Sequence, residues 1–215
     1  MSVVTKTGNK GGITPDVDGK NPRSTVSTVQ HGTYHMAASP AFYEPQRTNN
    51  FEFVVTDLDN ITRTLDNSLI DGAQEILRLS VTETSIPHFS QDPIAIRRGN
   101  SVLKYAGTPT FTDGQLTIND YIGADGKSIL MAWQNLSYNV KTEKVGLASE
   151  YKKDCYLIEY APDMQKVRQW RLHGCWVSNI TEGNYNSEDN SKKTIQATIQ
   201  YDRAEIDEYG SNMID

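Results

Sequence analysis

Few residues of this chain could do chemistry, and their spacing does not form a catalytic pattern. His31 and His35 stand four positions apart, as two metal ligands on one helical turn would, but the residues between them lack a helical pattern and no third ligand is nearby. The glycine-rich run at residues 8–12 lacks the Gly-Lys-Ser/Thr end and the strand–loop–helix setting of a phosphate-binding loop. No Gly-x-Ser-x-Gly nucleophile motif is present. We therefore expect a protein that is not an enzyme, with no catalytic residue, no metal site and no cofactor.

The two cysteines, Cys155 and Cys175, lie on the two strands of a predicted hairpin. A turn centred on residues 163–164 would place Cys155 opposite roughly Leu172 and Cys175 opposite Lys152. Because a disulfide needs Cβ atoms about 4 Å apart, this register argues against a bond between them. We interpret both residues as buried thiols, which fits a reducing compartment.

The charge balance argues against a protein that binds nucleic acid tightly. The formal net charge is −6, and lysine and arginine form only short, scattered clusters, whereas a protein that neutralises phosphates shows a basic patch or stripe. The N-terminal residues lack the apolar core of a secretory signal, and no apolar run approaches the ~18 residues of a membrane-spanning helix. We expect synthesis in a cytoplasm and no membrane partner.

Residues 1–48 differ in composition from the rest of the chain. They are rich in glycine, proline, serine and threonine and poor in large apolar side chains, so they cannot bury enough surface to fold alone. We interpret them as an extended or flexible N-terminal arm, followed by one β-rich domain at residues 49–215. Two interpretations of the arm stay open, a disordered tail and a segment that orders against a neighbouring subunit. The second interpretation depends on four large side chains with apolar surface, which are Tyr34, Met36, Phe42 and Tyr43.

From residue 51 onward the pattern is β, beginning with a strand at residues 51–55. Leu77, Leu79 and Val81 alternate with polar residues, which predicts a half-buried strand. Apolar runs on both sides of Arg98-Gly99-Asn100 predict a hairpin.

Two further segments are predicted before the last third of the chain. A second pair of strands is predicted around Asp113-Gly114, from Phe111 before it and Leu116 and Ile118 after it. One helix is predicted at residues 128–137, where a single apolar stripe should cover one face of the sheet. Asp125 or Ser128 can cap this helix, and its candidate core residues are Trp133 and Leu136.

The last third is strongly β. Strands at residues 155–160 and 166–176 are joined by a turn containing proline and aspartate, and a final strand follows a polar turn. In that final strand the candidate core residues Ile195, Ile199 and Tyr201 alternate with Thr194, Gln196, Thr198 and Gln200. A lone soluble sheet would carry more charge on this second face. We therefore predict that these four side chains line a lumen or an inter-subunit contact.

Three segments carry a resemblance to a known family. They are residues 170–180 (WRLHGCWVSNI), residues 183–185 (GNY) and residues 193–204 (KTIQATIQYDRA). The chain from Phe51 to Ile206 resembles the tail-tube proteins of contractile-tailed bacteriophages, a family related in fold to the tube-forming Hcp proteins of type VI secretion.

The resemblance implies a mainly β fold, a β-barrel-like sandwich with one flanking helix. It also implies subunits in hexameric rings that stack into the inner tail tube, a conduit for DNA and tape-measure protein without specific DNA binding. The implied partners are the tail sheath, tape-measure, baseplate and tail-terminator proteins, and the implied location is the virion tail, assembled in the host cytoplasm. Two alternatives stay open: an Hcp-like secretion-system tube protein, and a soluble β-sandwich that binds a carbohydrate or another ligand.

Overall fold

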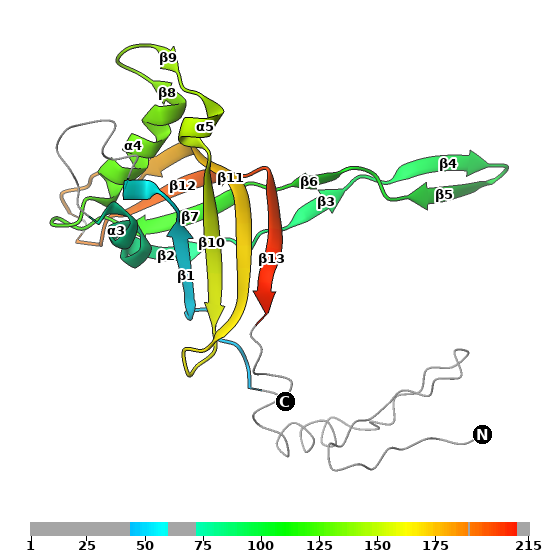
Figure 1. Cartoon of the computed structure of the whole chain (residues 1–215), viewed down its shortest axis with the longest axis horizontal. Helices are drawn as coiled ribbons and strands as arrows, with labels where there is room; N and C mark the ends of the chain where they lie inside the picture. The colour runs from blue at the N-terminus through cyan, green and yellow to red at the C-terminus, as the bar shows by residue number, and fades with distance from the viewer. Residues whose placement is uncertain (1–43, 60–71, 189, 210–215) are drawn as a thin grey trace. The chain divides into compact units, whose positions relative to one another are not determined.

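The computed structural model describes residues 44–59, 72–188 and 190–209 (Figure 1). The predicted arm residues Tyr34, Met36, Phe42 and Tyr43 lie outside these ranges. Residues 48–210 form one compact unit, which is mainly β, as the sequence predicted.

This unit contains three helices and thirteen strands among its described residues. The helices are α3 (Ala73–Ser80), α4 (Gly126–Ser137) and α5 (Ala148–Tyr151). The strands are β1 (Phe51–Val55), β2 (Val81–Thr84), β3 (Phe89–Gln91), β4 (Ile94–Arg98), β5 (Ser101–Tyr105), β6 (Pro109–Phe111), β7 (Gly114–Asn119), β8 (Tyr138–Asn139), β9 (Lys144–Val145), β10 (Lys153–Tyr160), β11 (Lys166–Glu182), β12 (Thr194–Gln200) and β13 (Arg203–Tyr209).

A seven-stranded sheet dominates the fold. Its strand order is β1-β10-β11-β12-β7-β2, with β13 paired to β11 and every described pair antiparallel. Among the described strands β1 and β2 stand at the two ends of this order without pairing. The barrel is therefore not closed, and the architecture is sandwich-like.

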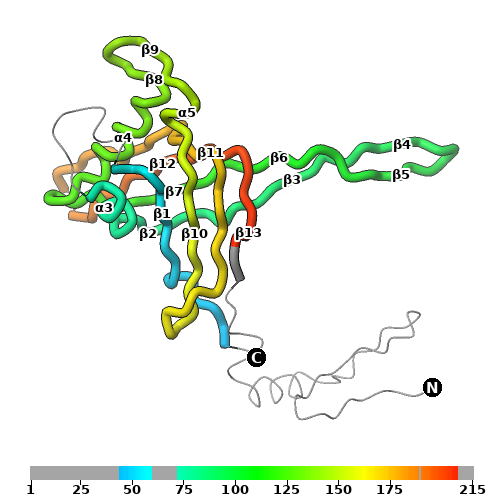
Figure 2. The backbone as a smooth tube through the Cα atoms, in the orientation of Figure 1, coloured from blue at the N-terminus to red at the C-terminus, as the bar shows by residue number. Residues whose placement is uncertain are grey.

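Strand β11 belongs to both halves of this sheet. Its 17 residues pair first with β10 and β13 and then with β12, and Figure 2 follows the strand from one group to the other. Gly174 lies between the residues that pair with β13 and those that pair with β12, with φ 67°, in the left-handed region that favours glycine.

The core is formed by one face of each strand and by two helices. The buried side chains of β12 are Ile195, Ala197 and Ile199, so its period-2 pattern places every second residue inside. Helix α4 adds Trp133, whose side chain is fully buried and whose Nε1–H donates to the Tyr151 carbonyl at 2.8 Å. Burial of one such large apolar side chain contributes about 2 kcal/mol.

Helix α4 begins at the residue that its sequence offers as a cap. Asp125 is the N-cap, and its carboxylate accepts from the Ser128 amide at 2.9 Å. Hydrogen bonds from the Ser128 hydroxyl and amide lower the pKa of Asp125 below its usual value. The cap satisfies an amide that has no partner within the helix.

Three local predictions were wrong. The region around Leu77 is the helix α3, because Ala73, Leu77 and Ser80 follow a helical spacing and are buried while Leu79 is exposed. Strands β6 and β7 flank Asp113-Gly114 but pair with β3 and β12 instead of with each other. The described residues also contain two helices besides the predicted one, and β13 was not predicted.

Candidate assembly surfaces

One outward face of the sheet carries almost no charge. We call it the uncharged face; its residues are Gln115, Thr117 and Asn119 of β7, Asn179 and Thr181 of β11, and Thr194, Gln196, Thr198 and Gln200 of β12. Register places them side by side, since Gln196 is paired with both Thr117 and Thr181. Gln196 is exposed and Thr194, Thr198 and Gln200 are half-buried. Glu83 of β2 adjoins the face at its edge opposite Thr117, and Asp120 and Glu182 adjoin one end of it in ion pairs with Lys193.

Local hydrogen bonds hold this face. The Gln115 amide donates to the Thr198 hydroxyl at 3.5 Å, and the Asn179 amide donates to the Thr181 hydroxyl at 3.1 Å. These groups remain able to bond water on their outer side. A surface of this kind is hydrated without presenting a strong field to a charged polymer.

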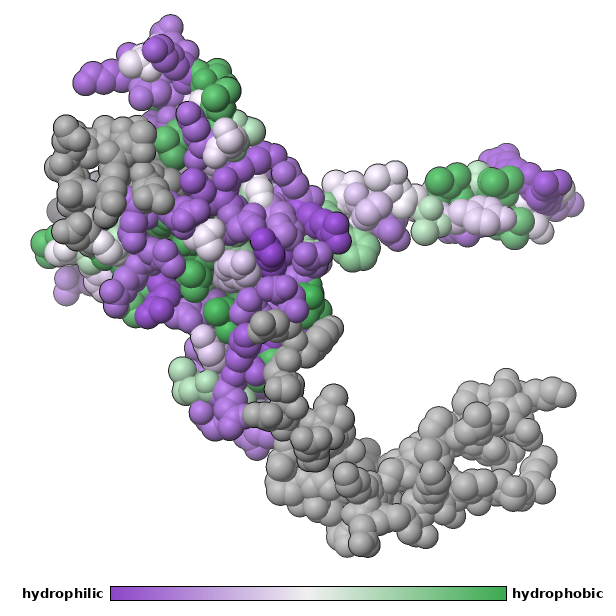
Figure 3. Space-filling model, in the orientation of Figure 1, coloured by the Kyte–Doolittle hydropathy of each residue, from purple (hydrophilic) through white to green (hydrophobic). Residues whose placement is uncertain are grey.

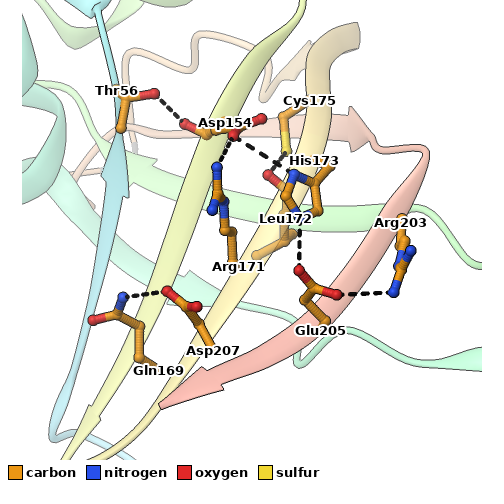
Figure 4. Close-up of polar contacts among 10 residues, drawn as sticks. All are labelled: Thr56, Asp154, Gln169, Arg171, Leu172, His173, Cys175, Arg203, Glu205 and Asp207. Atoms are coloured by element: carbon orange, nitrogen blue, oxygen red, sulfur yellow. Dashed lines mark hydrogen bonds and ion pairs between the residues drawn. The ribbon is translucent and has the colours of Figure 1, made fainter.

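The outward side of the other half of the sheet, formed by β10, β13 and the first half of β11, is charged (Figure 4). The Arg171 guanidinium donates to Asp154 at 2.9 Å, and His173 lies between two carboxylates, 3.0 Å from Glu205 and 3.6 Å from Asp154. Arg203 also pairs with Glu205, at 2.9 Å. β10, β11 and β13 each supply part of this network, so it joins three strands across their outer side.

The carboxylates of the network are held in their charged form. A hydrogen bond from His173, with the Arg203 charge, lowers the pKa of Glu205. Burial alone would raise the pKa of Asp154, but hydrogen bonds from Arg171 and from the Gly174 amide lower it on balance. The network therefore stabilises these strands where both carboxylates are ionised.

A long two-stranded hairpin leaves the body between β2 and β7. We call residues 89–111 the hairpin arm; β3 pairs with β6 near its base and β4 with β5 near its tip (Figure 1). Register places Ile94, Ile96, Leu103 and Tyr105 on one side of the ribbon, and each of them is 45–56% exposed. Figure 3 shows hydrophobic surface, in green, along the projecting arm. An isolated two-stranded ribbon is only marginally stable in water.

The base of the arm is anchored to the body. Phe89 packs on Phe111 with ring centroids 5.6 Å apart, and Phe111 packs on Tyr201 at 6.0 Å. The Thr112 amide donates to the His88 carbonyl at 3.2 Å, which continues the ladder toward the body. These contacts join the base of the arm to the core at Tyr201.

The residues predicted to pack in the core lie as follows. Trp133, Ile195 and Ile199 are buried, Tyr201 is 8% exposed, and Leu136 is partly buried against the core cluster. The hairpin arm was predicted as a hairpin, and its exposed apolar side was not. The sequence signal for the apolar side of the arm was an alternation of apolar residues in a basic segment. Such an alternation does not show whether the apolar side chains are buried or exposed.

The two cysteines are buried free thiols. Cys155 lies opposite Leu172, as predicted, and Cys175 lies opposite Lys153 instead of Lys152 because of a bulge between residues 153 and 155. Burial raises the pKa of the Cys155 thiol, and a hydrogen bond with Cys175 raises it further. The two thiols are therefore neighbours in the core, although the expected register had kept them apart.

The described residues contain neither a cluster of metal ligands nor a membrane-spanning helix. Within residues 44–59, 72–188 and 190–209, His, Cys, Asp and Glu form no group of three that could hold a metal ion. Over the same ranges no helix has the length and apolar character needed to cross a membrane.

The sequence model of the family described as T4-like virus tail tube protein gp19 matches residues 49–205. No curated protein matches the chain. Among solved structures, a sheath–tube complex of an extracellular contractile injection system has a TM-score of 0.55 at 18% identity, covering 79% of this chain and 95% of that one. The anti-feeding prophage tube-terminating cap has a TM-score of 0.54 at 17% identity, covering 75% and 90%. At this identity the two structures share the fold.

Proposed function

Because this chain belongs to the family of the T4-like virus tail tube protein gp19, we propose that it assembles into hexameric rings that stack into the inner tube of a contractile tail. The chain is a structural tail-tube protein and not an enzyme. Its place is in the tail tube of a contractile particle. Assembly takes place in the host cytoplasm and the tube becomes part of a virion.

The observation that carries this proposal is the uncharged face, which we place at the wall of the bore. A bore through which a long polymer passes needs a wall that stays wetted and offers few fixed binding points. Hydroxyl and amide groups from three neighbouring strands, with Gln196 at the centre, supply such a wall. The charged network of Figure 4 lies on the outward side of the other half of the sheet, where its paired charges would suit contact with protein.

The cargo in this proposal is DNA, preceded by the tape-measure protein. A net charge of −6 and scattered basic residues disfavour strong retention of phosphates. Each ring would contribute six copies of Glu83 at the edge of the wall, a weak repulsion that opposes sticking.

The proposed protein partners are other tail components. Solved relatives by fold include a sheath–tube complex, a sheath/tube terminator and an anti-feeding prophage baseplate. By analogy, the tube would contact a sheath along its length, a terminator at one end and a baseplate at the other. The sequence segment at residues 1–48 is proposed as a separate arm that contacts a neighbouring subunit.

Cryo-electron microscopy of assembled particles or recombinant rods tests this proposal. The expected result is a hollow tube with sixfold rings whose bore is lined by β7, β12 and the second half of β11. A solid filament, another symmetry, or a bore lined by β10 and β13 would contradict it.

A further inference from the structure

Two buried thiols lie together where β11 passes from one half of the sheet to the other. Cys155 and Cys175 are both free and both fully buried. In an unbulged ladder the two residues would be out of register, which argued against a bond between them. Between the pairs Lys153–Cys175 and Cys155–Leu172, however, β10 has one residue and β11 has two. This β-bulge changes the direction of the side chains beside it.

The bulge brings the Cys175 side chain toward the cross-strand partner of Cys155. Gly174 accommodates the extra residue with its left-handed φ of 67°. The Cys175 thiol donates to the Leu172 carbonyl at 3.5 Å, so its sulfur lies beside the residue that faces Cys155 across the ladder. The two thiols also share a hydrogen bond. Their sulfur atoms are therefore contact neighbours, which is the first requirement for a disulfide.

The thiol pair lies where several strand pairings end. Cys155 is the third residue of β10, which begins at Lys153. The last residue of β1, Val55, is paired with Cys155, and the pairing of β11 with β12 begins at Trp176. Local opening at this place therefore breaks few hydrogen bonds and does not require unfolding of the domain. It gives a small oxidant access to thiols that are otherwise buried.

The closed site keeps the thiols unreactive. Burial raises the pKa of the Cys155 thiol, and the hydrogen bond with Cys175 raises it further. Because the thiolate is the reactive form, reaction waits for the site to open. Within the described part of the chain no third His, Cys, Asp or Glu joins the pair to make a metal-binding group. The chemistry that remains for two adjacent thiols is their oxidation to a disulfide.

From this geometry we propose that Cys155 and Cys175 are an oxidation site, which forms an intramolecular disulfide when the folded chain meets a low-molecular-weight disulfide. One cysteine thiolate attacks the small disulfide, forms a mixed disulfide and releases one small thiol. The second cysteine then displaces the other small thiol. Two protein thiols and one small disulfide thus become one protein disulfide and two small thiols, so the protein is oxidised and the small disulfide is reduced.

The bond would join β10 to β11 at their bulge. It would close the loop of chain between residues 155 and 175 and so reduce the freedom of the unfolded chain. It would also hold the bulge at Gly174, between the residues of β11 that pair with β13 and those that pair with β12. The timing of the reaction rests on the proposed function: in a virion tail the bond would form after release from the reducing cytoplasm.

Oxidation of the isolated full-length chain tests the site. The folded protein is incubated with oxidised glutathione, the remaining thiols are blocked with a maleimide in denaturant, and the digested fragments are identified by mass spectrometry. We expect both thiols to disappear, a fragment pair joined through Cys155 and Cys175 to form, and no covalent dimer to form. The thermal unfolding midpoint should rise by roughly 5–10 °C and return to its first value when a reductant is added.

Cys155→Ala and Cys175→Ala are the matched controls. Each variant keeps one thiol, so neither should gain in unfolding midpoint on oxidation, relative to its own reduced form. The fragment analysis of the wild-type chain needs no variant, so the test holds even where a variant does not fold. A parallel wild-type sample in urea establishes that the oxidant is active.

Three outcomes would overturn the site: thiols that stay reduced in the folded chain while the unfolded chain is oxidised, a stable mixed disulfide with glutathione, and a covalent dimer in place of the internal bond. An internal bond that leaves the midpoint unchanged would overturn its stabilising role. Because the assay uses the isolated subunit, each of these outcomes leaves the tube proposal untouched. Material that never forms rings or rods contradicts the tube and leaves the thiol pair in place.

Discussion

Gly174 lies directly against Asp202: a Cβ atom added to Gly174 would collide with the Asp202 carboxylate. Asp202 in turn accepts from the Lys152 ammonium at 2.6 Å, so the carboxylate is held in place from the other side. The contact sits where β11 leaves β13 for β12, and Gly174 has a left-handed φ there. A side chain at position 174 would be disfavoured twice, by the left-handed backbone conformation and by collision with the Asp202 carboxylate.

Substitution at this glycine should therefore destabilise the whole domain. We expect Gly174→Ala to lower the free energy of unfolding by about 2–4 kcal/mol, from the left-handed backbone and the displaced carboxylate together. Urea unfolding of the monomer measures it. Gly183→Ala is the matched control, since a Cβ there meets nothing within 4 Å, and an equal loss in both variants would contradict the explanation.

Removal of the Trp133 side chain should test the core. Trp133→Ala leaves a cavity between α4 and the sheet and removes the donor to the Tyr151 carbonyl. We expect a loss of about 3–5 kcal/mol in unfolding free energy. Met131→Ala on the exposed side of α4 should cost less than about 1 kcal/mol. A small effect at Trp133 would mean that the helix is not packed as described.

The charged network predicts a dependence of stability on acid. The folded-state pKa values of Asp154 and Glu205 are lowered, so their stabilisation is present above the unfolded pKa values and is lost as pH falls through the folded ones. We expect the unfolding free energy to decline between roughly pH 5 and pH 3. Glu205→Gln should flatten part of that decline, whereas Glu143→Gln, an exposed change outside the network, should not. An unchanged slope in Glu205→Gln would exclude the network as its source.

The hairpin arm offers a variant that separates folding from assembly. A Cβ on Gly107 would collide with the Asp92 carbonyl oxygen across the ribbon. Gly107→Ala should distort the arm, leave the thermal unfolding midpoint of the body within about 2 °C, and lower rod formation in electron micrographs. Gly123→Ala, where a Cβ meets nothing within 4 Å, is the control. Rods of normal abundance from Gly107→Ala would show that the arm's shape is not needed.

The bore assignment predicts an effect on ejection. Gln196→Lys with Gln200→Lys would place a ring of cations on the proposed wall, and DNA exit should slow because phosphates bind them. Gln196→Ser with Gln200→Ser keeps the wall neutral and should eject at the normal rate. Intact tubes with unchanged kinetics in the lysine variant would place these residues away from the DNA path.

The fold was predictable where local pattern and burial coincide. Strand β12 alternates without interruption because Ile195, Ala197 and Ile199 all enter the core, and α4 has both a cap and a stripe. Where two periodicities share residues, as at Leu77 and Leu79, the sequence alone could not decide between strand and helix. Tertiary contact with β1 and β7 favours the helix there.

Other features depended on partners far along the chain. Strand β13 carries Arg203, Glu205 and Asp207 on its outward side, a pattern typical of a solvated tail, and only pairing with β11 makes it a strand. The chain does pass from one strand to the next at Asp113-Gly114, as the turn residues predicted, but β7 pairs with β2 and β12. The bore assignment stays a prediction made from the lack of charge on β12, whereas the exposed state of the arm required the structure.

The double membership of β11 also has a mechanical consequence. Its 17 residues run without a break from the charged network to the uncharged face. If the uncharged face lines the bore of a tube, a load applied at the charged network would reach the bore wall along one covalent backbone. The load would strain the hydrogen bonds that flank the strand together, along its length. The two surfaces of such a tube would then move together, because strand β11 couples them mechanically.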